Sequence, residues 1–183
     1  MIGFKHYYKS DEMIGTGDYV FRRVSSQPPE SEIEVDSRFI SYISGTLEEI
    51  LPEDFGNIAT IPDNILCCLL TSTTIPRTPF KVTLPDTVTT IGNSTLYHAY
   101  IKEVVFPANI SDIYPGVMQA AYSGAIADFS KAKNIPILRS DDDGGYAQFT
   151  GSTIKTIKVP SGLYSSWSAR SDWSHVADKL VSV

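Results

Sequence analysis

The stretch FKVTLPDTVTTIGNSTLYHAYIKEVVFPANISDIYPGVM, residues 80–118, contains one pattern twice. When VTLPDTVTTIGNSTL (82–96) is laid over VVFPANISDIYPGVM (104–118), six apolar or proline positions coincide, with Val82 on Val104 and Pro85 on Pro107. In each unit the first and third residues have the two-residue apolar period of a strand, and proline follows at once. Each unit is therefore predicted to be a short strand followed by a turn.

The register extends in both directions from this stretch. Upstream, IPDNI (61–65) matches LPDTV (84–88), which sets Ile61 against Leu84. Downstream, IADFS (126–130) sets Phe129 against Phe106, which we expect to be a central core residue.

A further strand and proline, TIKVP (156–160), follow RSDDDGGYAQFTGS (139–152), whose aspartates and glycines predict a loop. One short strand for about every 20–25 residues is typical of a leucine-rich-repeat solenoid, in which each turn buries its apolar side against the next. The sequence repeats, on this interpretation, because each turn has to stack on another.

The predicted fold class is therefore β-rich α/β, a short leucine-rich-repeat solenoid with additions at both ends. Residues 1–45 do not repeat and are predicted to form a β segment that caps or anchors the stack, with strands in IGFKHYYK, DYVFRRV and RFISYIS. A polar, proline-broken connection, SSQPPESEIEVD, separates the last two. The repeats are assigned to residues 46–160, and residues 161–183 to a small helical cap.

The C-terminal segment predicts a cap with two helical stretches, at about 161–169 and 172–179. Ser171 and Asp172 are expected to cap the second of them. An apolar helical stripe predicts packing on the last repeat; its members are Leu163, Trp167, Val176 and Leu180. Trp167 and Trp173, with Tyr164, would alternatively form a stacking shelf for carbohydrate.

These units resemble the BspA-like class of leucine-rich repeat, whose typical unit has an apolar residue, proline, a later valine and then Ile-Gly, followed by an aromatic residue and a cysteine. The sequence departs from that pattern, with Tyr97-His98 near the cysteine position and Tyr114-Pro115 in place of Ile-Gly in the second unit. The terminal module IKVPSGLYSSWSARSDW is similar to the end of such proteins. The resemblance covers roughly residues 58–183 and implies either a bacterial surface adhesin or a virion component of a phage that infects gut bacteria.

Composition excludes several classes of function. A net charge of −6 and a pI near 5.0 argue against a nucleic-acid partner, which requires a basic surface. No run of about 18 apolar residues predicts membrane insertion, and the N-terminus has no long apolar region of a signal peptide. Adjacent Cys67 and Cys68 are interpreted as buried thiols.

No constellation for catalysis stands out, so we expect a protein that is not an enzyme and has no cofactor, catalytic residue or metal site. The aspartates of DDDGG (141–145) resemble part of a calcium loop, but Ser152 stands where the twelfth-position glutamate is required. Calcium binding there is left open beside a solvated loop. The three histidines lack metal-ligand spacing, and GTGDY (15–19) is too short for a dinucleotide fingerprint.

What remains is a surface. If the apolar strand positions point inward, alternation directs Thr83, Val105, Asp128 and Lys158 outward. Together with Glu103 they form the predicted binding row. The row contains polar, apolar and charged residues, is nearly neutral, and does not indicate a particular ligand.

The resemblance and the missing leader lead to the hypothesis of a virion attachment or decoration subunit, assembled in the host cytoplasm, oligomeric or bound to the particle, with other virion proteins as partners. The alternative is a bacterial cell-surface or secreted adhesion module that binds a host protein or glycan.

Overall fold

The computed structural model describes most of the chain from residue 49 onward and the backbone of four short strands before it. The described residues after 48 are 49–52, 55, 57–64, 66, 79–121, 124–151 and 154–183. In the N-terminal part, β1 (Phe4–His6) pairs in parallel with β2 (Tyr19–Phe21), and β3 (Val35–Asp36) pairs antiparallel with β4 (Phe39–Ile40). β1, β2 and β4 lie within the three predicted strand segments, whereas β3 lies in the predicted connection. Cys67 and Cys68 fall outside the described residues.

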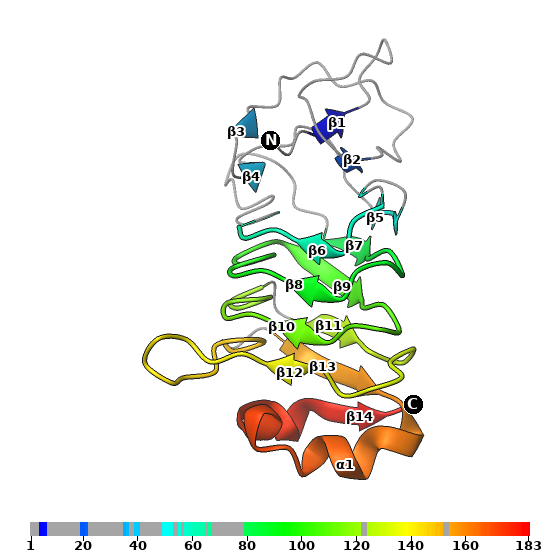
Figure 1. Cartoon of the computed structure of the whole chain (residues 1–183), viewed down its shortest axis with the longest axis vertical. Helices are drawn as coiled ribbons and strands as arrows, with labels where there is room; N and C mark the ends of the chain where they lie inside the picture. The colour runs from blue at the N-terminus through cyan, green and yellow to red at the C-terminus, as the bar shows by residue number, and fades with distance from the viewer. Residues whose placement is uncertain are drawn as a thin grey trace.

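The remaining strands form two parallel sheets, so the chain has an α/β fold with few helices (Figure 1). The six-stranded sheet has the order β14-β13-β11-β9-β7-β5, and the four-stranded sheet has the order β12-β10-β8-β6. The six strands are β5 (Glu49–Ile50), β7 (Phe80–Thr83), β9 (Ile101–Val105), β11 (Ala125–Asp128), β13 (Ile154–Val159) and β14 (Leu180–Ser182). The four are β6 (Thr60–Ile61), β8 (Thr90–Ile91), β10 (Asp112–Ile113) and β12 (Ile137–Leu138).

From β5 to β12 the strands alternate between the two sheets along the chain, so each turn of the chain, which we call a coil, contributes one strand to each sheet; β13 and β14 both belong to the larger sheet. In the six-stranded sheet Val82 pairs with Val104, and Val104 pairs with Ala127. In the four-stranded sheet Ile91 pairs with Ile113. These pairs confirm the predicted alignment of the two quoted units with each other and of IADFS with the second unit.

The upstream match of IPDNI (61–65) to LPDTV (84–88) is wrong. Ile61 lies in β6 and pairs with Ile91 of β8, rather than occupying the place of Leu84. The backbone amide of Asn64 likewise donates to the carbonyl of Asn93. An apolar residue followed by Pro-Asp thus occurs at two different places in the coil, and the sequence alone does not separate them.

The core lies between the sheets and confirms the predicted strand phase. Every residue predicted to point inward from the larger sheet is buried: Val82, Leu84, Val104, Phe106, Ala127, Phe129, Ile157 and Val159. The rings of Phe106 and Phe129 stack, with centroids 4.0 Å apart and planes 10° apart. The repeat therefore places similar side chains above one another. Their packing joins each coil to the next.

A residue with left-handed backbone recurs beside the core at four places along the chain, and this feature was not predicted. Leu66, Leu96, Met118 and Phe149 have φ between 52° and 61°, and all four are buried. Such φ values are unfavourable for residues other than glycine, so stacking in the core must hold these turns. The segment 139–152 has no helix or strand among its described residues, as predicted, but its Phe149 belongs to the core.

The cap contains η2 (Ser161–Leu163), a short 3-10 helix, followed by α1 (Tyr164–Ser168) and a second 3-10 helix, η3 (Ser171–Lys179). These bounds confirm the two predicted helical stretches. In the predicted stripe Trp167, Val176 and Leu180 are buried and Leu163 is partly buried. The strand that follows, β14, was missed; it extends the larger sheet by pairing with β13. Figure 1 shows α1 at the far end of the stack from β5.

Replacing Phe106 by alanine should lower the free energy of unfolding by about 3–5 kcal/mol, the range for deleting a buried aromatic ring. The ring is fully buried against Phe129 and contacts Phe149 edge-on. The matched change Val105→Thr, at the neighbouring position on the outer face of β9, should cost less than about 0.5 kcal/mol. Chemical denaturation of both variants measures the difference, and equal losses would contradict the strand phase.

Candidate interaction surface

The predicted binding row lies on the outer face of the six-stranded sheet. Thr83, Val105, Asp128 and Lys158 are register neighbours on β7, β9, β11 and β13, and all four side chains are half-buried. Glu103 lies one row away on β9, beside Lys81 of β7. Strand alternation therefore placed the five residues on the same face, although none of them is fully exposed.

Lys158 is the centre of an ion network on this face. Its Nζ lies 2.9 Å from Oε1 of Glu103 and 3.2 Å from Oδ2 of Asp128. Lys81 extends the network, with Nζ 3.9 Å from Glu103 and 3.7 Å from Glu49. We call these five residues the charge ladder; they join β5, β7, β9, β11 and β13. Three carboxylates and two ammonium groups leave the ladder with nearly balanced charge.

The ion pairs of the charge ladder shift the pKa values of Lys158 and Asp128. The hydrogen bond to Glu103 raises the pKa of Lys158, and Asp128 adds to this against the cost of burial. Burial alone would raise the pKa of Asp128, but hydrogen bonds from Ser130 and Lys158 outweigh it and lower the pKa. Both groups therefore stay charged over the ordinary pH range, and the face is held by paired side chains that are already in place.

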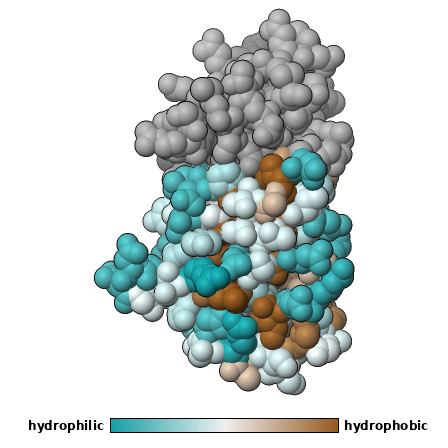
Figure 2. All heavy atoms as spheres, viewed as in Figure 1, coloured by the Kyte–Doolittle hydropathy of each residue, from teal (hydrophilic) through white to brown (hydrophobic). Residues whose placement is uncertain are grey.

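The outer face of the four-stranded sheet carries a second cluster, which sequence reasoning missed. The guanidinium of Arg139 binds the carboxylate of Asp112, with Nε to Oδ1 at 2.7 Å and Nη2 to the same oxygen. Ile137 and Tyr114 are exposed beside this pair. On the face in view, Figure 2 shows brown apolar areas among polar side chains. The only sequence signal was an arginine two residues before the three aspartates of the predicted loop.

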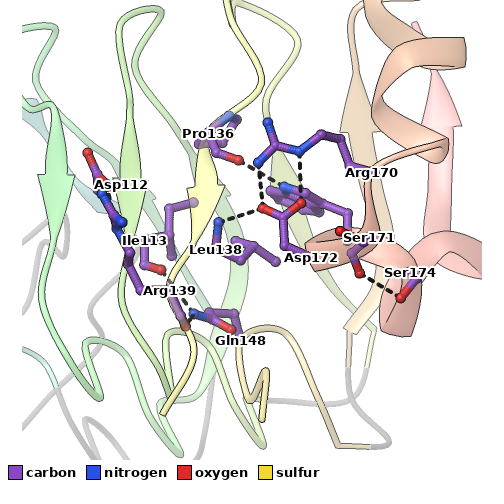
Figure 3. Close-up of polar contacts among 11 residues, drawn as sticks. Asp112, Ile113, Pro136, Leu138, Arg139, Gln148, Arg170, Ser171, Asp172 and Ser174 are labelled. Carbon is purple, nitrogen blue, oxygen red and sulfur yellow. Dashed lines mark hydrogen bonds and ion pairs between the residues drawn. The ribbon is translucent and has the colours of Figure 1, made fainter. Parts of the chain in front are cut away.

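The edge of the four-stranded sheet is closed by two side chains of η3 (Figure 3). The backbone amide of Leu138 donates to Oδ2 of Asp172 over 3.0 Å, and Nε1 of Trp173 donates to the carbonyl of Pro136 over 2.9 Å. Arg170 holds the carboxylate through two hydrogen bonds, Nε to Oδ1 at 2.8 Å and Nη2 to Oδ2 at 2.7 Å.

The predicted role of Ser171 and Asp172 as helix caps is wrong. Both residues lie inside η3, which begins at Ser171; the N-cap residue is Arg170, and it makes no side-chain capping hydrogen bond. Asp172 turns instead toward β12, where it is buried. Burial would raise its pKa, but the hydrogen bonds from Arg170 and Leu138 prevail and lower it. The carboxylate is thus kept ionised inside the protein by a partner two residues away.

The alternative interpretation of the tryptophans as a carbohydrate shelf is also wrong. Trp167 and Trp173 are fully buried, with ring centroids 5.1 Å apart. Trp173 stacks on Phe149 at 5.5 Å, and Trp167 lies 5.5 Å from Phe129. Neither indole face is open to a ligand, so both belong to the core between the last coil and the cap.

In the acidic loop, Asp141 shapes the backbone. Its Oδ1 accepts hydrogen bonds from the amides of Gly145 at 2.6 Å and Asp143 at 3.2 Å. Within the described part of the chain, no three His, Cys, Asp or Glu side chains are grouped as metal ligands would be. His98 is exposed, whereas Nε2 of half-buried His175 lies 3.0 Å from the carbonyl oxygen of Gln148.

Comparison with known proteins finds no matching family model, and neither a curated protein nor a solved structure shows significant similarity. Among the described residues, none of the helices has the length and apolar character needed to cross a bilayer.

Replacing Lys158 by methionine should destabilise the fold by about 1–2 kcal/mol, because two partly buried carboxylates lose their shared cation. The control, Lys131→Met, removes an exposed lysine from the turn that follows β11. It should change the free energy of unfolding by less than about 0.5 kcal/mol. Urea denaturation measures both variants. Equal effects would mean that the ladder contributes nothing beyond net charge.

Acid should remove the stabilisation that Asp172 provides. Its folded-state pKa lies below the unfolded value of about 3.9, so the unfolded chain binds the extra proton first. The contribution is therefore complete above that unfolded pKa and is lost as the pH falls through the folded pKa. The free-energy difference between wild type and Asp172→Asn should be constant near neutral pH and shrink in this acid range. A difference that does not change with pH would contradict a charge-dependent role.

Proposed function

We propose that this chain is a non-enzymatic structural and interaction protein, a short solenoid of BspA-like leucine-rich repeats that displays a rigid surface. The charge ladder is the observation that carries the proposal. Its charged side chains bind one another across five strands, so the outer sheet face has a fixed shape and nearly balanced charge. A fixed surface of this kind suits recognition by shape, because little side-chain freedom is lost on binding.

The repeats are of the leucine-rich kind in this proposal. The register that pairs Val82 with the equivalent Val104 of the next unit supports it, as does the proline that follows β7, β9 and β13 within two residues. The sequence resemblance rests in part on the terminal LYSSW and DW residues. Of these, Trp167 and Trp173 are buried in the core, and Asp172 and Trp173 bond to the edge of β12.

The most specific form of the proposal is a phage virion attachment or decoration subunit. The two ends of the stack differ. Its C-terminal end is covered by the cap, whereas β5 and β6 are the described strands that stand last at the other end of the two sheets. Such asymmetry suits attachment through the N-terminal side and display of the coils. The partners would be other virion proteins, and assembly would take place in the host cytoplasm.

Proteomics of particles purified from the biological source tests this placement. We expect the chain to co-purify with the particle proteins in constant proportion through successive density gradients. Recovery only in a bacterial envelope or secreted fraction would contradict the virion role. It would favour the alternative, an adhesion module that binds a host protein or glycan.

A surface test separates the ladder from the fold. In a reconstituted particle, Lys158→Met should weaken incorporation or partner binding more than Lys131→Met does, when both variants are compared well below their melting temperatures. Unchanged incorporation of Lys158→Met would show that the outer face of the larger sheet is not the surface used.

A further inference from the structure

In the four-stranded sheet, backbone hydrogen bonds join each strand to the strand of the next coil, and β12, at the end of the sheet, lacks such a partner among the described strands on one side. The amide of Ile137 donates to the carbonyl of Ser111 over 2.7 Å, and the amide of Arg139 donates to the carbonyl of Ile113 over 2.9 Å. Each inner strand of this sheet is thus bonded on its far side by the coil that follows. β12 is the last of the described strands on this side of the sheet, so none of them follows it to bond the corresponding residues, Pro136 and Leu138.

Side chains take the place of that strand. Oδ2 of Asp172 accepts from the Leu138 amide, as a strand carbonyl would, and Nε1 of Trp173 donates to the Pro136 carbonyl, as a strand amide would. Both side chains are buried, and the two bonds are of ordinary backbone length, 3.0 and 2.9 Å. Figure 3 shows the carboxylate of Asp172 between Leu138 and Arg170.

The pair satisfies the Leu138 amide and the Pro136 carbonyl without presenting a new strand edge. A carboxylate and an indole present no row of alternating amides and carbonyls, so a further strand finds no pattern to pair with. Arg170 occupies both oxygens of the carboxylate from the outer side.

We propose that Asp172 and Trp173 form a strand stop, which closes the β12 edge against pairing with a second copy of this chain. A second copy is the occupant that fits, because among the described strands the same sheet ends at β6 on its other side. Thr60 of β6 is in register with Thr90, which pairs with Asp112 and through it with Ile137. Parallel addition of β6 from another copy would therefore continue the pairing already present in the sheet.

Such a contact would join unlike ends of two copies. Contacts of this head-to-tail kind do not close on themselves unless the rotation forms a ring, and they otherwise produce open-ended chains. The strand stop thus keeps the displayed stack finite.

The test uses the full chain carrying Asp172→Ala and Trp173→Phe together, which removes both edge bonds and keeps an aromatic ring against Phe149. At low protein concentration the Leu138 amide should exchange with solvent at least about tenfold faster than in wild type, because its bonded state opens more readily. With rising concentration, analytical ultracentrifugation should show larger species, and the Leu138 amide should regain protection. Wild type should show neither change.

The control is Ser174→Ala, which removes a hydrogen bond to the Ser171 carbonyl within the same helix and touches neither edge group. It should behave as wild type in both measurements. The proposal is overturned if the double variant stays monomeric at all concentrations with a fast Leu138 amide, or if it associates without protecting that amide. Should circular dichroism show that the double variant is unfolded, Asp172→Ala alone, which frees the Leu138 amide, decides by the same two readouts.

Discussion

The stacking of each coil's inward side chains on those of the next coil is the constraint on which the rest of this structure depends. One inward column contains Val82, Val104 and Ala127. These residues are direct register partners on parallel strands, so all three side chains point to the same face of the sheet. A shift of one residue would turn the whole inner column outward. The stack of Phe106 on Phe129 shows how closely the coils approach when this register is kept.

A stack built in this way has two ends, and the C-terminal end is closed by two different means. The apolar column ends on Trp167 and Trp173, which cover Phe129 and Phe149. The hydrogen-bonding edge of β12 ends on Asp172 and Trp173, which bond to backbone groups. Trp173 serves both purposes, since its ring packs in the core and its Nε1 reaches the strand. The loss of this one residue would therefore open the end of the stack in two ways.

Much of this arrangement could be predicted from the sequence, because alternation and spacing determine which strand residues point inward. The phase of β7, β9, β11 and β13 follows directly from Val82, Phe106, Phe129 and their equivalents. Phe149 could not be assigned in this way, since it lies in a left-handed turn that follows a loop of irregular length. β14 was hidden for another reason: only Leu180 of its three residues is buried, so it has no alternating pattern to detect.

The candidate site shows the same division. Alternation placed Lys158 and Asp128 on one face, but the bond from Lys158 to Glu103 passes over β11 and depends on the order of strands in the sheet. The contact of Asp172 with Leu138 joins residues that are separated in the sequence by a loop, β13, η2 and α1. Local propensity suggested a helix cap instead. Long-range polar contacts of this kind follow from packing and are not encoded in any local pattern.

The most direct test of the account is a set of nuclear Overhauser contacts between side-chain methyl groups in the full-length protein in solution. The account predicts contacts of the Val104 methyls with those of Val82 on one side and Ala127 on the other, and none with Thr83 or with residues one position out of register. Contacts of Val105 in place of Val104 with this column, or the absence of any contact between Val104 and either of its two predicted neighbours, would contradict the stacked register.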